Sequence, residues 1–124
     1  TGQEAWRFRI RGDLRALPAL VSSPVITHGN VIFGAGDSYV YALSEADGSE
    51  RWRIKTDWIV NSSPAVAGDV VYFGSDDGHL YALEAQSGEL LWRLFLGGQV
   101  VASPVIADGS VYVGSTNRNF FAVR

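Results

Sequence analysis

Short runs of apolar residues recur along the chain and are separated by polar or glycine-containing turns. β-Branched and aromatic residues fill these runs, and none of the runs shows the sustained 3.6-residue period of an amphipathic helix. Turns such as His28-Gly29 and Asp108-Gly109 separate neighbouring runs. Because residues of this kind tolerate a positive φ, the turns predict β-hairpins. The pattern therefore predicts an all-β fold of short antiparallel strands.

The predicted strands fall into groups of four that repeat every 40 residues. Four features recur at this spacing, namely a Ser-Pro pair, a glycine, an alanine and a tryptophan: Ser23-Pro24, Ser63-Pro64, Ser103-Pro104, Gly34, Gly74, Gly114, Ala42, Ala82, Ala122, Trp52 and Trp92. Trp6 precedes Trp52 by 46 residues, since six extra residues lie ahead of the first Ser-Pro pair. A four-stranded unit of about 40 residues is typical of a β-propeller blade. A plain β-sandwich, the alternative, would not repeat these residues at one period.

We therefore interpret residues 1–124 as one propeller segment with repeats at approximately 1–43, 44–83 and 84–124. Composition narrows the class of protein further. The formal net charge of −3 argues against a nucleic-acid-binding module, and no apolar run approaches the length of a membrane span. The chain has no cysteine, which excludes disulfides and thiolate nucleophiles from this segment. Since it also lacks methionine and opens at Thr1-Gly2, we expect a piece of a longer protein or a processed one.

Residues 82–92, Ala-Leu-Glu-Ala-Gln-Ser-Gly-Glu-Leu-Leu-Trp, resemble the tryptophan-docking motif A-x-D-x-x-T-G-x-x-x-W of the pyrroloquinoline-quinone (PQQ) propeller family. Glu84 stands in place of the Asp and Ser87 in place of the Thr. Residues 42–52 match the motif again, and both ends of the chain match parts of it. The resemblance implies that each tryptophan packs against a neighbouring blade, where small residues leave room for it. The blade-docking residues that it implies are Trp6, Ala42, Gly48, Trp52, Ala82, Gly88, Trp92 and Ala122.

Three blades do not close a propeller, which typically has four to eight. Either the ring is incomplete, as in a fragment of a larger propeller, or oligomerisation closes it. In the second case the strand Trp6–Ile10 of one copy would complete the three-stranded last blade of another. Two copies would then give six blades. The ends favour this joining, because Arg124 is the third position of the motif and Thr1 is the sixth.

No constellation of catalytic, cofactor-binding or metal-ligating residues is predicted. His28 and His79 lie far apart in the sequence and neither belongs to a motif with a partnered carboxylate. Asp76-Asp77-Gly78 is predicted to be a turn rather than a cation site, since the equivalent Gly36-Asp37-Ser38 lacks the paired charge. We therefore expect neither a cofactor nor an enzymatic activity in this segment.

A candidate partner surface lies on the loops that join the fourth strand of one blade to the first strand of the next. Trp58 is the one tryptophan outside the repeat, and it lies in such a loop beside Ile59. With Leu14 and Leu17 it could form an apolar patch of the kind that marks partner surfaces. The alternative is a loop residue folded onto its own blade.

Three functional hypotheses follow. The first is a non-catalytic PQQ-like module that acts as a protein-interaction or assembly scaffold, as the resemblance to BamB-like lipoproteins implies. The second is a fragment of a PQQ-dependent quinoprotein dehydrogenase, and the third is a repeat unit that self-assembles into a closed ring. The expected partners are proteins bound through loops on one face, further copies of the chain, or the missing blades of a parent. A periplasmic or cell-surface location is implied by the resemblance alone.

Overall fold

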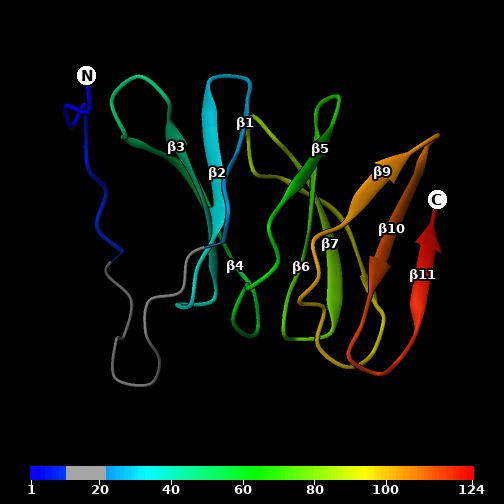
Figure 1. Cartoon of the computed structure of the whole chain (residues 1–124). Helices are drawn as coiled ribbons and strands as arrows, with labels where there is room; N and C mark the ends of the chain where they lie inside the picture. The colour runs from blue at the N-terminus through cyan, green and yellow to red at the C-terminus, as the bar shows by residue number, and fades with distance from the viewer. Residues whose placement is uncertain (11–21) are drawn as a thin grey trace.

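A computed structural model describes residues 1–10 and 22–124, which form three antiparallel sheets arranged in a row (Figure 1). The first sheet contains β1 (Val25–Thr27), β2 (Asn30–Gly34), β3 (Tyr39–Ser44) and β4 (Glu50–Lys55). The second contains β5 (Ala65–Ala67), β6 (Val70–Gly74), β7 (His79–Glu84) and β8 (Leu90–Phe95). The third contains β9 (Val105–Ala107), β10 (Ser110–Gly114) and β11 (Phe120–Val123).

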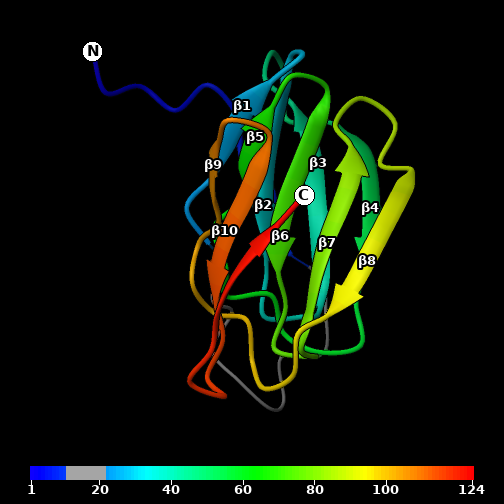
Figure 2. The same cartoon turned by 90° about the vertical axis from the view of Figure 1, so that its right-hand side faces the viewer.

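Within each sheet the strands are adjacent in chain order, so every connection is a hairpin. The predicted all-β fold with four-stranded antiparallel units is thereby confirmed for the first two sheets. The third has three strands in the described residues. Figure 2, which looks along the row, shows the three sheets stacked face to face.

The hairpin turns at His28-Gly29 and Asp108-Gly109 adopt the backbone conformation that the sequence predicts, whereas at Gly68-Asp69 only Gly68 has a positive φ. His28 and Gly29 both have positive φ, 52° and 73°, and so do Asp108 and Gly109, 51° and 77°. Two successive residues of positive φ give a turn whose twist matches that of the flanking strands. This is why three-residue first strands pair in register with the longer second strands.

The third and fourth strands of the complete sheets pair in the same register. Ala42 lies opposite Trp52, Ala82 lies opposite Trp92, and a bulge follows each alanine. Side chains directly opposite one another project from the same face of a sheet. The small alanine therefore leaves the indole free to lie over that face and reach the next sheet.

The core of the molecule lies between the sheets. Buried side chains from the first and second sheets pack together in one cluster: Ile32, Val40, Ala42, Trp52, Val60, Val71, Phe73, Tyr81, Leu83 and Ala85. A second cluster joins the second sheet to the third: Leu80, Leu96, Val100, Val111 and Val113. A third covers the outer face of the first sheet, where Trp6, Phe8 and Ile10 pack against Phe33 and Tyr41. Each sheet is thus stable because its neighbour removes an apolar face from water.

Trp6 and Trp52 each contact the next sheet along the chain in the same geometry. Trp52 donates its indole N–H to the carbonyl oxygen of Ala85 at 3.0 Å, and its ring lies against Gly88. Trp6 repeats the contact one sheet earlier, with a 3.0 Å hydrogen bond to the carbonyl oxygen of Glu45 and its ring against Gly48. Gly88 has a φ of +75°, and a Cβ there would lie 2.6 Å from Cδ2 of Trp52. The glycine is therefore required both by the backbone and by the ring.

Trp92 is placed differently from the other two. It is 37% exposed, whereas Trp52 is 8% exposed. Its aromatic neighbour is Tyr72, at 5.9 Å between ring centroids, on its own sheet. Ala122, the third repeated alanine, is exposed in β11.

The substitution Gly88→Ala tests the ring contact against a matched control in the same sheet. Gly68 also has a positive φ (+60°), but a Cβ there would meet nothing within 4 Å. Gly68→Ala should cost about 1–2 kcal/mol of unfolding free energy, the penalty for a left-handed L-residue. Gly88→Ala should cost at least about 1 kcal/mol more, because the indole must move. Urea-induced unfolding measures both, and equal losses would contradict the docking role of Gly88.

Candidate functional site

The loops that connect successive sheets meet the β2–β3 and β6–β7 turns on one face of the molecule, the loop face, which is at the bottom of Figure 1. The segment between β4 and β5 begins at Thr56, which is buried. Its backbone N–H and its Oγ1 both donate to the carbonyl oxygen of Ser38, at 2.8 and 2.9 Å. The same hydroxyl is 2.5 Å from the carbonyl oxygen of Trp58. This loop is therefore attached at its start to the turn of the preceding sheet.

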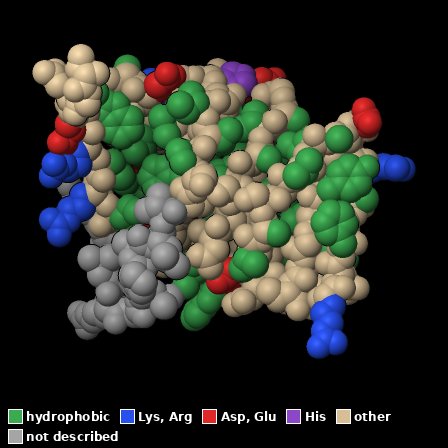
Figure 3. All heavy atoms as spheres, viewed as in Figure 1, with side chains coloured by type: hydrophobic (Ala, Val, Ile, Leu, Met, Phe, Trp, Pro, Cys, Tyr) green, Lys and Arg blue, Asp and Glu red, His purple; other side chains and the backbone are tan. Residues whose placement is uncertain are grey.

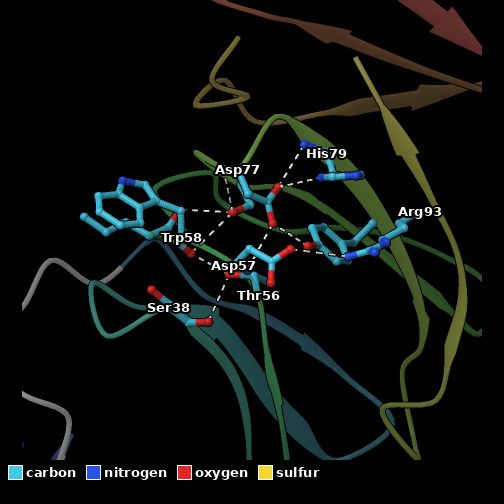
Figure 4. A network of polar contacts seen from close by, with 10 residues as sticks. Ser38, Thr56, Asp57, Trp58, Asp77, His79 and Arg93 are labelled. Carbon is cyan, nitrogen blue, oxygen red and sulfur yellow. Dashed lines mark hydrogen bonds and ion pairs between the residues drawn. The ribbon is translucent and has the colours of Figure 1, made fainter. Parts of the chain in front are cut away.

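Asp77, in the β6–β7 turn, is the centre of the polar network shown in Figure 4. Its carboxylate accepts hydrogen bonds from the backbone N–H of His79 at 2.9 Å and of Asp57 at 3.2 Å. The Tyr81 hydroxyl donates to it as well, and His79 Nδ1 lies 3.2 Å away. Asp57 in turn forms an ion pair with Arg93 at 3.7 Å. The network joins the β4–β5 loop to the second sheet.

The electrostatics of Asp77 and Tyr81 follow from this geometry. Burial alone would raise the pKa of Asp77, but the hydrogen bonds from Tyr81, His79 and Asp57 outweigh it and hold the pKa below its ordinary value. Burial raises the pKa of Tyr81, and its hydrogen bond to the Asp77 carboxylate raises it further. The pair therefore consists of a carboxylate and a neutral phenol at neutral pH.

The Asp–Tyr contact is a repeated structural feature rather than a unique one. In the first sheet the Tyr41 hydroxyl donates to Asp37 in the same way. In the third sheet Asn117 and Phe121 occupy these positions, and Asn117 donates to the carbonyl oxygen of Leu96 at 2.9 Å. Sequence reasoning missed this contact, although the Asp and Tyr pairs share the 40-residue spacing and could have revealed it. A feature present in two repeats is better explained by turn stability than by chemistry.

Trp58 departs from the repeat and is exposed on this face of the molecule. Its side chain is 55% exposed, and in Figure 4 the indole points away from the polar network. Ile59, expected beside it on the surface, is 8% exposed and lies in the interior. Leu14 and Leu17, the other members of the expected patch, lie outside the described residues. Trp58 is thus the one described member of that patch that the structure leaves accessible.

The backbone beneath Trp58 is held on both sides. Ser75 Oγ donates to the carbonyl oxygens of Trp58 and Ile59, at 3.4 and 3.2 Å, and the Asp76 N–H donates to Ile59 at 2.9 Å. Val60 fills the space over Gly34, where a Cβ would lie 2.3 Å from Val60 Cγ1. The indole therefore projects from a backbone that is fixed by neighbouring sheets.

Asp76, whose backbone N–H bonds to Ile59, has one unsatisfied carboxylate oxygen. Burial raises the pKa of Asp76, although Asn61 donates a 3.0 Å hydrogen bond to one carboxylate oxygen. The other oxygen is buried without a hydrogen-bond partner. Among residues 1–10 and 22–124, no three His, Cys, Asp or Glu side chains are grouped as metal ligands would be.

A separate open cleft lies between the N-terminal segment and the first sheet. Acidic, basic and aromatic side chains line it: Arg7, Phe8, Arg9, Asp37, Tyr39, Tyr41, Glu50 and Arg53. The Arg53 guanidinium lies 5.2 Å from the centroid of the Tyr39 ring. Charges of both signs are interspersed here, which favours no single class of charged ligand.

Solved structures share this arrangement of sheets. BamB from Moraxella catarrhalis is 20% identical, with a TM-score of 0.69 over 80% of this chain and 35% of that chain. The quinohemoprotein alcohol dehydrogenase ADHIIG from Pseudomonas putida HK5 is 25% identical, with a TM-score of 0.75 over 89% of this chain and 18% of that one. The computationally designed Ika4 protein is 19% identical, with a TM-score of 0.72 over 82% of this chain and 64% of Ika4.

These similarities confirm the propeller fold, with an open and incomplete ring. The chain spans about a third of the BamB structure and under a fifth of the dehydrogenase. No curated protein is similar enough in sequence to count as a relative. The described part of the chain also has no helix long and apolar enough to cross a membrane.

The sequence profile of one family matches this chain. The family is described as "Outer membrane protein assembly factor BamB", and it matches residues 1–57 and 36–124, which together include the whole chain. The matched ranges overlap, as expected when one profile of repeated blades aligns twice to a repetitive sequence. The chain therefore belongs to the PQQ-like β-propeller family to which this BamB profile corresponds.

Proposed function

We propose that this chain is a non-catalytic propeller module that binds a protein partner through the loop face around Trp58. The observation that carries the proposal is an indole, 55% exposed, on a backbone fixed by hydrogen bonds from Ser75 and Thr56. Tryptophan is enriched among the residues that dominate binding energy at protein interfaces. An anchor whose backbone is already ordered loses little conformational entropy on binding.

Comparison of the repeats indicates that the Trp58 side chain is not needed for folding. Trp58 occupies a position where the next repeat has Gly98, and the ring makes none of the inter-sheet contacts made by Trp6 and Trp52. The fold is thus built with a much smaller residue at the equivalent site. BamB, named as an outer membrane protein assembly factor, provides a precedent for protein association in this family.

A fragment of a quinoprotein dehydrogenase is the second candidate function. The observation that favours it is the similarity to the alcohol dehydrogenase ADHIIG, which extends over 89% of this chain. Titration with PQQ, followed by quenching of tryptophan fluorescence, separates the two proposals. The scaffold proposal predicts no saturable quenching, whereas saturable binding of PQQ would favour the dehydrogenase fragment.

The partner surface is tested with peptides that are selected from a random displayed library for binding to the native chain. The affinity of these peptides is then measured for the native chain and for the Trp58→Ala variant. Binding should weaken at least about tenfold, because the anchor is lost. The free energy of unfolding should change by less than about 0.5 kcal/mol, since the ring is exposed. Ile26→Ala is the matched control, as Ile26 is 60% exposed on β1. Equal weakening by both substitutions would contradict the proposal.

The pH dependence of stability tests the network that fixes the loop. Because the pKa of Asp77 is lowered in the folded state, its ionised form stabilises the fold above the unfolded-state pKa of about 3.9. This stabilisation is lost as the pH falls through the lower, folded-state pKa. Asp77→Asn should therefore cost about 1–3 kcal/mol at neutral pH. The difference from the native chain should shrink below about pH 4.

Chemical denaturation at pH 7, 5, 4 and 3 measures this difference. The matched control is Asp108→Asn, a substitution at an exposed aspartate in a hairpin turn of the third sheet. The control should change the free energy of unfolding at pH 7 by less than about 0.5 kcal/mol, since its side chain is exposed. A difference between native chain and Asp77→Asn that stays constant from pH 7 to pH 3 would overturn the assigned role of Asp77.

A further inference from the structure

The outer edge of β11 is exposed at positions that are buried in the other two sheets. Phe120 is 74% exposed, whereas Val40 and Leu80, which occupy the same position in β3 and β7, are both 0% exposed. β3 and β7 each pair with a fourth strand, and β11 pairs with β10 alone in the described residues. Figure 3 shows hydrophobic side chains at this end of the row, over the third sheet. An unpaired edge of this kind is a template for another strand.

The strand β8, in the neighbouring second sheet, is exposed along its whole length. Apolar side chains along the strand are each more than a third exposed: Leu90, Leu91, Trp92, Leu94 and Phe95. In the preceding interface the equivalent Trp52 is covered by Gly88 and the carbonyl of Ala85, which belong to the loop before the fourth strand of the next sheet. Among residues 1–10 and 22–124 the third sheet has no such strand. The edge of β11 and the ring of Trp92 are therefore both left exposed for the same reason, which is that the third sheet has no fourth strand and no preceding glycine loop among the described residues.

Residues 1–10 have the sequence of that element and no sheet partner among the described residues. Residues 6–8, Trp-Arg-Phe, correspond to Trp-Arg-Ile at 52–54 and to Trp-Arg-Leu at 92–94. Their side chains alternate, with Trp6, Phe8 and Ile10 packed on the first sheet and Arg7 and Arg9 exposed. In Figure 1 this segment lies at the opposite end of the row from β11. One chain therefore cannot pair its own residues 1–10 with its own β11 in this structure.

We propose that residues 1–10 of a second copy of this chain add to β11 as the fourth strand of the third sheet. The register follows from the two complete sheets, in which Ala42 pairs with Trp52 and Ala82 with Trp92. Applied to β11, the same register places Ala122 opposite Trp6 of the second copy and Phe120 opposite its Phe8. Phe120 then enters an apolar pairing equivalent to Val40 with Ile54 and to Leu80 with Leu94.

The same register accounts for the exposed indole of Trp92. Gly2 precedes Trp6 by the four residues that separate Gly48 from Trp52 and Gly88 from Trp92. Gly2 of the second copy therefore lies against Trp92 as Gly88 lies against Trp52. Gly2 also has a positive φ, +77°, and a Cβ on it would meet nothing within 4 Å in a single chain. Gly2 thus has the positive φ of the docking glycines Gly48 and Gly88, and no ring of the described residues lies against it.

When each of two copies adds its residues 1–10 to β11 of the other, both ends of each row are covered and the sheets form a closed ring. Each copy contributes three sheets, and the resulting six lie within the four to eight blades that propellers adopt. Three copies would exceed this range. Since every contact is used twice with the same residues, the assembly has the two-fold symmetry that most homo-oligomers show. This inference does not depend on Trp58, which lies on the loop face rather than at either end.

Light scattering behind a sizing column tests the stoichiometry. We expect a mass of twice 13.4 kDa for the native chain. Phe120→Asp should raise the dissociation constant of the dimer at least about tenfold, since it places a charge in the new sheet. Trp58→Asp is the matched control, because it places the same charge on an apolar side chain, 55% exposed, that lies at neither end of the row. A single species of 13.4 kDa at all concentrations would overturn the proposal.

Cysteine pairing tests the register, because the native chain has no cysteine. Tyr39 pairs with Lys55, and His79 pairs with Phe95. The equivalent pair across the new edge is Asn119 with Arg9 of the second copy. A mixture of Asn119→Cys and Arg9→Cys chains should form a disulfide-linked heterodimer under mild oxidation.

The control mixture combines Asn119→Cys with Ile10→Cys. A shift of one residue turns the thiol to the other face of a strand, so this mixture should remain largely unlinked. Equal linking in the two mixtures, or a dimer of native mass in which Arg9→Cys and Asn119→Cys do not link, would contradict strand addition in this register. Preferential linking of the Arg9→Cys mixture supports it.

Discussion

The packing of an indole from one sheet against a glycine turn of the next is the contact on which the rest of this structure depends. A single four-stranded sheet of this size cannot bury either face alone. Trp52 crosses to the second sheet, donates to the Ala85 carbonyl and occupies space that only Gly88 leaves. The buried clusters between sheets then follow, since the indole fixes the spacing at which Val40, Phe73 and Tyr81 come together.

This constraint separates the molecule into surfaces with different roles. The loop face is fixed by hydrogen bonds around Asp77 and Thr56, so Trp58 can be exposed without loss of order. At the two ends of the row lie the surfaces that an internal sheet would bury against its neighbours. At one end Trp6 and Phe8 cover the first sheet, and at the other Phe120 and Trp92 are exposed.

Most of the fold could be predicted from the sequence because the repeat is explicit. The positive φ at His28-Gly29 follows from residue type, and the four-stranded unit follows from the 40-residue spacing. The candidate site was less predictable, since burial in a loop depends on the neighbouring sheet. Ile59 is apolar like Trp58, yet it lies in the interior while the loop leaves the indole exposed. The contact between Asp77 and Tyr81 was missed because its two residues belong to different local elements, a turn and a strand, and only their joint 40-residue spacing relates them.

Amide hydrogen exchange of residues 4–10 tests most directly whether the two ends of the row complete each other. In a single chain these residues belong to no strand, although Trp6 and Phe8 pack on the first sheet. If the segment is the fourth strand of a second copy's sheet, its amides should exchange as slowly as those of β4 and β8. The protection should decrease on dilution together with that of β11. Exchange of residues 4–10 at the rate of an unstructured peptide, at concentrations where β4 and β8 remain protected, would contradict the addition of this segment to the third sheet of a second copy.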